Sequence, residues 1–224
     1  MSVKNPSEAY SVRRKRAKKI LLILKKLFPE AHIALKFRNN WELLVSVILS
    51  AQCTDKKVNE VTEKLFKKYK KLDDYVRENS AEFEQDIKST GFYHNKAKNI
   101  LAAAKIVKEK FNGKVPRTMK EILTLPGVAR KTANVVLGNA YGVVEGIAVD
   151  THVMRLAQKF GLTDQKDPVK IERDLMQLFP RNEWFAITYR LINYGREICV
   201  RRKHPNCGEH PLTKIYPPAQ NIWP

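Results

Sequence analysis

Apolar residues along this chain recur with the spacing of helices, and the alternation typical of strands is scarce. From Asp55 onward they fall at every third or fourth position, with lysine and glutamate on the other face. The same spacing runs from Ala97 to Phe111, where Asn112-Gly113 indicates the end of a helix. The stretch 41–51 is apolar on nearly every face, which predicts a helix at the centre of a core. These patterns predict an all-α fold of about ten helices.

Residues that cap helices mark several of the predicted starts. Asp55 is a predicted N-cap, and Thr118 with Glu121 has the spacing of a capping box. Asp167-Pro168 predicts another start, because proline is favoured at the first helical position. The segment from Pro205 to Pro224 holds five of the eleven prolines and little periodicity, so we expect irregular chain there.

The charge balance indicates the kind of partner. The 224 residues carry 42 Lys and Arg against 23 Asp and Glu, a formal charge of +19. Such an excess points to a polyanion such as nucleic acid. A hydrophobic content of 43% excludes a disordered chain. No apolar run reaches the roughly 18 to 20 residues that a membrane helix requires, so we expect no membrane span and no membrane partner.

The basic run 13–19 precedes only five apolar residues, 20–24, which is too short for a signal peptide. The run is either a nuclear address or the solvated face of a basic amphipathic helix, and we favour the helix face. Three cysteines, an odd number, agree with a reducing compartment. We therefore expect a cytoplasmic, nucleoid-associated protein, or a nuclear one if the chain is eukaryotic.

The segment 123–137 has the pattern of two helices joined by a tight turn at Pro126-Gly127, with the second helix beginning near Ala129 or Arg130. Backbone N–H groups at that helix start suit a phosphate, and such a contact does not depend on base sequence. An ordinary turn between two helices has the same pattern. The basic composition favours phosphate binding.

Lys131 falls in the first turn of this second helix, where the helix dipole and Arg130 both disfavour its ammonium form. A lysine that can lose its proton near neutral pH is a nucleophile for electrophilic carbon. The alternative is that Lys131 contacts a phosphate as a cation.

Asp150 ends an apolar run and precedes another predicted helix, so it is expected to be an ionised N-cap. It either only caps the helix or also stabilises a cationic sugar or orients a nucleophile, as carboxylates do at oxocarbenium centres. We expect His152, two residues later, to be structural.

Three motifs together resemble endonuclease III, in the helix-hairpin-helix DNA glycosylase superfamily: LPGVARKTANVVL at 125–137, VDTH at 149–152 and LSAQCTD at 49–55. The resemblance implies two all-α domains. One is a six-helix barrel at 34–146 that carries the hairpin, and the other is formed by 1–33 with 147–224. DNA would cross the cleft between them, with Lys131 and Asp150 facing each other.

The resemblance also implies a reaction on damaged double-stranded DNA. An oxidised pyrimidine is flipped out, Lys131 attacks C1′ of its sugar, and Asp150 supports the positive charge. The resulting imine permits β-elimination, which cuts the strand on the 3′ side. Gln52 and Phe92 would fill the vacated space. Without the resemblance, Gln52 would be a helix-end residue and Phe92 a core aromatic.

The implied DNA-binding residues come from the hairpin and from a basic loop near the C-terminus. They are Gly127, Ala129, Arg130 and Thr132 of the hairpin and Arg201, Arg202 and Lys203 of the loop. Ala129 stands where the family carries a second glycine. We expect a monomer.

The chain departs from the family at the four cysteines that hold its iron-sulfur cluster. It has Cys199 and Cys207 with seven residues between them, then His210 at the third ligand position and Tyr216 at the fourth. We expect no cluster, because such clusters depend on thiolates. Zinc bound by Cys199, His204, Cys207 and His210 is an alternative. We favour a metal-free loop and no cofactor.

Two other functions fit the charge and the hairpin equally well. One is a non-catalytic helix-hairpin-helix DNA-binding protein, and the other is a mismatch glycosylase that removes a base without cutting the strand. Superfamily members that only remove the base lack an amine at the position of Lys131. We therefore favour a bifunctional glycosylase and abasic-site lyase in base excision repair.

Overall fold

The computed structural model of the chain describes residues 10–201 and 205–222, and every regular element among them is a helix. The predicted all-α fold class is confirmed. The chain divides into two compact units, one of residues 33–145 and a terminal unit that joins the residues up to His32 with those from Gly146 onward. Within the described ranges, no helix is both long and apolar enough to cross a membrane.

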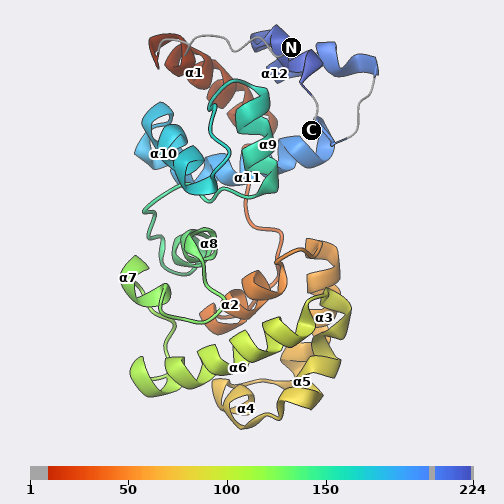
Figure 1. The fold of residues 1–224 in the computed structure, drawn as a ribbon, viewed down its shortest axis with the longest axis vertical. Helices are drawn as coiled ribbons and strands as arrows, with labels where there is room; N and C mark the ends of the chain where they lie inside the picture. The colour runs from red at the N-terminus through yellow and green to blue at the C-terminus, as the bar shows by residue number, and fades with distance from the viewer. Residues whose placement is uncertain (1–9, 202–204, 223–224) are drawn as a thin grey trace. The chain divides into compact units, whose positions relative to one another are not determined.

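The 33–145 unit, all of whose residues are described, contains seven α-helices and one 3₁₀ turn (Figure 1). In chain order they are α2 (Asn40–Leu49), α3 (Asp55–Lys68), α4 (Leu72–Arg77), α5 (Ser80–Ile87), η1 (Lys88–Thr90), α6 (Tyr93–Lys110), α7 (Met119–Ile122) and α8 (Arg130–Tyr141). The number exceeds by one the six that the resemblance implied. The shortest, α7, is a single turn of four residues.

Helix α2 forms the centre of this unit. All of its residues from Trp41 to Leu49 are buried, and it packs against α3, α6 and α8. The sequence pattern, apolar on nearly every face, predicted such a helix. Full burial of a valine or leucine side chain stabilises a fold by about 1.5–3 kcal/mol. This short helix therefore supplies a large share of the unit's hydrophobic stabilisation.

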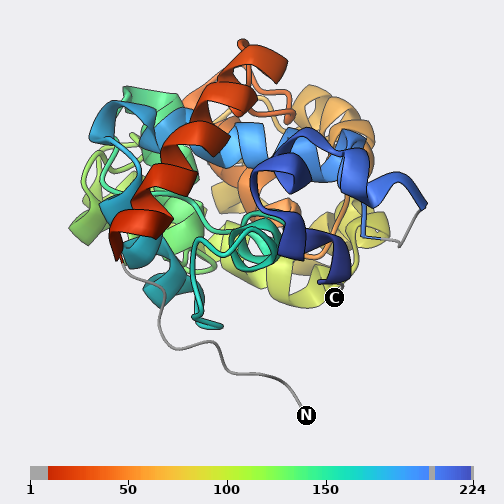
Figure 2. The same cartoon turned by 90° about the horizontal axis from the view of Figure 1, so that it is seen from above.

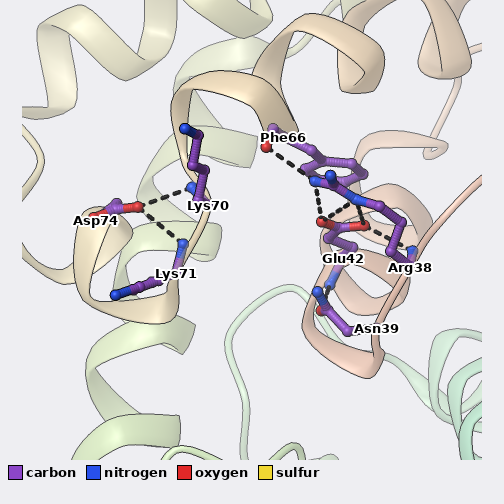
Figure 3. A network of polar contacts seen from close by, with 7 residues as sticks. All are labelled: Arg38, Asn39, Glu42, Phe66, Lys70, Lys71 and Asp74. Carbon is purple, nitrogen blue, oxygen red and sulfur yellow. Dashed lines mark hydrogen bonds and ion pairs between the residues drawn. The ribbon is translucent and has the colours of Figure 1, made fainter.

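Polar contacts attach the start of α2 to the end of α3 (Figure 3). Asn39 caps α2 by accepting a hydrogen bond from the Glu42 N–H at 2.9 Å. The buried Glu42 carboxylate accepts from the Arg38 guanidinium and from the Arg38 N–H, each at 2.7 Å. Arg38 also donates to the Phe66 carbonyl of α3 at 3.0 Å. In the same view, Asp74 accepts from the backbone N–H groups of Lys70 and Lys71 before α4.

The observed helix ends agree with two of the predicted signals and correct a third. Thr118 caps α7 by accepting from the Glu121 N–H, and α6 ends just before Asn112-Gly113. Asp55, however, is the first residue of α3 and not its N-cap. The hydroxyl of Thr54 accepts from the Lys57 N–H instead. An aspartate in the first turn still interacts favourably with the helix dipole.

The terminal unit brings both ends of the described chain together. Its elements are α1 (Tyr10–Leu27), α9 (Thr151–Lys159), α10 (Pro168–Leu178), η2 (Arg181–Glu183), α11 (Trp184–Glu197), η3 (Pro205–Glu209), α12 (Pro211–Ile215) and η4 (Pro217–Asn221). Helix α1 packs against α10, α11 and α12, and Figure 2 shows it in red in the same unit as the dark blue C-terminal segment. Asp167 caps α10 with Pro168 at its first position, as predicted.

The C-terminal segment is not irregular, which corrects the prediction. Helix α12 and the turn η4 each begin at a proline, because its fixed φ and missing N–H suit the first helical position. Leu212 and Ala219 are buried in the core of the terminal unit. The described residues hold twelve α-helices, more than the expected total of about ten, because one-turn helices leave little periodicity.

A buried ion-pair network joins α1 to α11. Glu183 accepts a hydrogen bond from Lys25 of α1 at 2.6 Å and another from Arg190 of α11 at 2.5 Å. The Glu183 and Arg190 side chains are only 10% and 9% exposed. Burial by itself would raise the pKa of Glu183. The hydrogen bonds from Lys25 and Arg190 outweigh burial and hold that pKa below its ordinary value.

We predict that acid weakens the fold through this carboxylate. Because the pKa of Glu183 is lower in the folded state, Glu183 contributes to the free energy of unfolding above its unfolded pKa of about 4.3. This contribution is lost as the pH falls through the folded pKa. Glu183→Ala should lower the free energy of unfolding at pH 7 by about 3 kcal/mol, since Arg190 is left buried without its carboxylate. Urea unfolding should give a smaller difference in the free energy of unfolding between wild type and variant at pH 3 than at pH 7. Equal differences at the two pH values would contradict the prediction.

Candidate active site

The predicted hairpin is present, and it joins α7 to α8. The chain turns after Leu125, whose carbonyl accepts a hydrogen bond from the Val128 N–H at 3.2 Å. Gly127 has a φ of 79°, and a Cβ at this position would lie 3.0 Å from the Cβ of Asn99 on α6. Glycine is therefore required both by the left-handed backbone and by the close approach to α6.

The start of α8 has no side-chain cap. Its N-cap is Ala129, in an extended conformation with φ −91°, and an alanine side chain accepts no hydrogen bond. The helix's own hydrogen bonds begin with the Ala133 N–H donating to the Ala129 carbonyl at 2.9 Å. The N–H groups of the first turn and the positive end of the helix dipole suit a phosphate. Any residue adopts this φ, so Ala129 does not strain the turn.

The structure gathers the predicted hairpin residues around this first turn. Helix α8 begins at Arg130, so Lys131 and Thr132 lie in its first turn as the sequence predicted. Lys131 is half-buried. It belongs to the 33–145 unit, whereas Asp150 belongs to the terminal unit.

Asp150 is the N-cap of α9, as predicted. Its Oδ1 accepts a hydrogen bond from the Val153 N–H at 2.8 Å. The backbone that leads into this cap is held in place, because residues 147–149 are buried and Thr188 donates to the Ala148 carbonyl at 3.3 Å. The cap engages one carboxylate oxygen, and a carboxylate accepts through both. Capping is therefore compatible with a second role for this half-buried side chain.

Gln52 and Phe92 share an unusual backbone conformation. Their φ values are 53° and 49°, in the left-handed region that costs a residue with a side chain about 1–2 kcal/mol. Both side chains are exposed, and Phe92 is 63% exposed. An exposed aromatic on strained backbone is the opposite of the core residue that the pattern alone suggests. Such strain collects at functional sites. No sequence signal marks a left-handed glutamine or phenylalanine.

Arg201 is exposed and lines a cavity of about 410 Å³ in the terminal unit, together with His152 and Arg155 of α9. The other predicted residues of the basic loop, Arg202 and Lys203, lie outside the described residues. The His152 ring packs closely on α11, because a Cβ on Gly195 would lie 2.9 Å from its Nδ1. This packing agrees with the structural role expected of His152.

Cys199 and Cys207 are buried, and neither forms a disulfide. The Cys199 Sγ lies 3.8 Å from the Arg155 guanidinium, and the Cys207 Sγ lies 3.7 Å from the Lys159 ammonium. Among the residues with described placement, no group of three or more His, Cys, Asp or Glu side chains could hold a metal ion. His210 is buried at the start of α12, and His204 lies outside the described residues.

Tyr216, which the resemblance places at the fourth cluster position, packs against α1. The guanidinium carbon of Arg16 lies 4.0 Å from the centre of the Tyr216 ring. Arg16 also donates to the Gly161 carbonyl at 2.6 Å. A Cβ on Gly161 would lie 2.5 Å from the Arg16 Nη1, so glycine makes room for this contact. Side chains of α1 and of the C-terminal segment therefore fill the space around Tyr216.

Comparison with known proteins gives the family. The family model described as "HhH-GPD superfamily base excision DNA repair protein" matches residues 45–181. This range includes the hairpin and Asp150. Endonuclease III from Synechocystis sp. is 51% identical over 208 residues, covering 93% of this chain and 94% of the relative. The chain belongs to the endonuclease III family. Endonuclease III from Bacillus subtilis is 47% identical over 190 residues, or 84% of this chain and 86% of the relative.

Solved structures of endonuclease III share the fold of this family member. A trapped endonuclease III–DNA covalent intermediate matches with a TM-score of 0.87 and 42% identity, covering 93% of this chain and 97% of that one. A non-covalent endonuclease III–DNA complex matches equally well. A thermostable thymine-DNA glycosylase, 24% identical with a TM-score of 0.79, supports the fold alone. The predicted family and its place among base excision repair glycosylases are confirmed.

We predict that Gly127→Ala damages the hairpin. The strained φ and the contact with Asn99 should lower the free energy of unfolding by about 1–2 kcal/mol and weaken binding to duplex DNA. Gly142→Ala is the matched control, because its φ of 66° is equally left-handed but a Cβ there would meet no atom within 4 Å, and it should change DNA affinity little. Thermal unfolding and fluorescence anisotropy with an undamaged duplex measure both effects. Equal DNA affinities of the two variants would show that binding does not need glycine at 127.

Proposed function

We propose that this protein removes oxidised pyrimidine bases from damaged double-stranded DNA and cuts the strand at the resulting abasic site. The observation that carries the proposal is Lys131, an amine in the first turn of the hairpin helix beside backbone donors suited to a phosphate. An amine in this turn is near the sugar whose phosphate the turn would hold. One similar endonuclease III structure is of a trapped covalent intermediate with DNA, the kind of adduct that such an amine forms.

In the proposed reaction, the nitrogen lone pair of Lys131 attacks C1′ of the damaged nucleoside, and the nitrogen loses a proton. The new bond to C1′ forms as the bond from C1′ to the base breaks. The base leaves with that electron pair and takes up a proton. The nitrogen lone pair then forms a C=N bond as the C1′–O4′ bond breaks, and O4′ takes up a proton, which gives a protonated imine. Loss of a C2′ proton then expels the 3′ phosphate, because the C3′–O bond breaks. Water hydrolyses the imine and frees Lys131.

Asp150 is proposed to stabilise the positive charge that develops on the sugar. Its place as the cap of α9 supports this role, because the hydrogen bond from Val153 orients the carboxylate while the second oxygen is not used by the cap. Carboxylates serve in this way at oxocarbenium centres.

Gln52 and Phe92 are proposed to fill the space that the flipped base leaves. Flipping costs a few kcal/mol, and an apolar or aromatic side chain inserted into the stack offsets part of that cost. The support is that both residues are exposed and lie at left-handed positions on loops. A buried side chain could not insert without leaving its packing partners.

The proposed grip on DNA is to its backbone. It uses the hairpin residues Gly127, Ala129, Arg130 and Thr132, together with Arg201, Arg202 and Lys203. A net charge of +19 supports this, because phosphate contacts release counterions and make affinity fall with salt.

The proposed setting is the bacterial cytoplasm, where the protein acts as a monomer on the chromosome. The relatives named above come from bacteria.

We also propose that no iron-sulfur cluster, zinc ion or other cofactor takes part. The residues do not fit a four-iron cluster, because two of the four family positions hold His210 and Tyr216 and the Tyr216 ring is packed against Arg16. The two thiols lie beside Arg155 and Lys159. These contacts favour a metal-free loop over the zinc set of Cys199, His204, Cys207 and His210.

We predict that borohydride traps a covalent complex between the wild-type protein and a duplex containing thymine glycol. Lys131→Ala should abolish trapping, because the imine nitrogen is lost, and should retain binding to the duplex. Lys120→Ala, which removes an exposed lysine of α7, is the matched control and should trap normally. Denaturing gel electrophoresis measures trapping, and anisotropy measures binding.

The same assay separates the competing functions. Trapping that survives in Lys131→Ala would assign the nucleophile to another amine. Base release with intact strands would indicate a mismatch-type glycosylase, and binding without base release would indicate a non-catalytic DNA-binding protein.

We predict that the purified protein is colourless and contains neither iron nor zinc at a stoichiometric level. Elemental analysis and the absorption spectrum near 400 nm measure this, because iron-sulfur clusters absorb there. Thermal stability should not change on treatment with a chelator. One zinc per chain would establish the Cys/His set, and four irons per chain would overturn the cofactor proposal.

A further inference from the structure

Lys96, in the first turn of α6, is a buried lysine. Its exposed fraction is 4%, and burial lowers its pKa, although the nearby thiol of Cys53 acts in the opposite direction. Cys53 itself is half-buried. Within the described chain no carboxylate forms an ion pair with Lys96. A charge buried without a counterion persists only where hydrogen bonds offset its loss of water.

Two hydrogen bonds to main-chain carbonyls supply that offset. The Lys96 ammonium donates to the carbonyl of Leu49 and to the carbonyl of Thr90, each at 2.8 Å. Leu49 is the last residue of α2, and Thr90 is the last residue of η1. Carbonyls at helix ends lack donors within their own helix and carry partial negative charge. The two oxygens lie no farther apart than twice the hydrogen-bond distance, so one cation joins the ends of two helices.

Each of these carbonyls lies just before a left-handed residue, Gln52 or Phe92. Gln52 follows Leu49 by three positions, and Phe92 follows Thr90 by two. The backbone N–H of Lys96 also donates to the Phe92 carbonyl at 3.1 Å. Lys96 therefore holds both loops. Its side chain binds the carbonyl before Gln52, and its side chain and backbone N–H both bind carbonyls of the loop that contains Phe92.

We propose that Lys96 is a positioning residue whose ammonium sets the spacing between the Gln52 loop (residues 50–53) and the Phe92 loop (residues 90–93). This inference rests on the proposed function, in which Gln52 and Phe92 together fill the space of one flipped base. Two side chains that enter one gap need a fixed separation, because any loop ordering on insertion costs free energy. The hydrogen bonds from Lys96 to the Leu49 and Thr90 carbonyls form a clamp that removes that cost before DNA binds.

A merely structural role for Lys96 makes a different prediction. Loss of fold stability lowers the fraction of active protein, so it slows every reaction of the enzyme by the same factor. Loss of the clamp slows only the reactions that require a base to be flipped and its space filled. Two substrates separate these cases. One is a duplex with thymine glycol, and the other is a single-stranded oligonucleotide with a preformed abasic site, which has no base to flip.

The test uses Lys96→Met, which keeps the length of the side chain and removes its donors. Under single-turnover conditions we expect base removal from the duplex to slow by about tenfold or more, since misplacement of about 1 Å can cost a hundredfold. Cleavage of the single strand should stay within about twofold of wild type. Lys96→Arg retains donors and should recover part of the duplex rate. Lys105→Met, an exposed lysine of the same helix, is the matched control and should leave both rates unchanged.

Amide hydrogen exchange gives a readout that does not depend on catalysis. In Lys96→Met, residues 50–53 and residues 90–93 should both exchange faster, while α8 should not change. Equal slowing of the two reactions, or no slowing of either, would overturn the clamp, as would faster exchange in only one of the two segments. A wild-type protein that neither removes thymine glycol nor traps would overturn the proposed function, and the exchange result would still decide whether Lys96 couples the loops.

Discussion

The burial of α2 on all sides is the constraint on which the 33–145 unit depends. The helix packs against α3, α6 and α8, so Gln52, Phe92 and the hairpin are carried by elements that share one hydrophobic support. Its end supplies the Leu49 carbonyl to Lys96, and the Gln52 loop follows directly. The hairpin helix α8 packs against the same core. Because interiors are close-packed, a change in volume within α2 is transmitted to its neighbours and is not absorbed locally.

Positive charge has two distinct uses in this chain. Most of the lysines and arginines are exposed and contribute to the net charge of +19 that suits a polyanion. A few are buried and hold the backbone together instead. Lys96 joins two helix ends, Arg190 binds Glu183, and Arg16 lies on the ring of Tyr216. The buried cations do not add to a DNA-binding surface, because their donors already bind protein oxygens or face an aromatic ring.

Contacts of buried cations hold the C-terminal segment within the terminal unit. Arg16 and Tyr216 pack on each other, and Gly161 leaves room for the guanidinium. Lys159, which is only 1% exposed, reaches the Cys207 sulfur and donates to the Ile222 carbonyl at 2.9 Å. The segment also forms α12 and η4, whose prolines suit helix starts. Packing and hydrogen bonds therefore hold the C-terminal segment to α1 and α9.

The sequence by itself determined the helical class, the central helix, the hairpin and the cap at Asp150. Each of these follows from a short-range property: periodicity, a left-handed glycine, or a side chain that reaches an N–H a few residues away. The N-cap of α3 also depends on short-range contacts, but Thr54 and Asp55 are both suitable capping residues, and the pattern does not distinguish between them. Only the tertiary structure decided that Phe92 is exposed on strained backbone and that Lys96 is buried beneath both loops. Those features depend on contacts between residues as far apart as 49 and 96, and such contacts leave no period in the sequence.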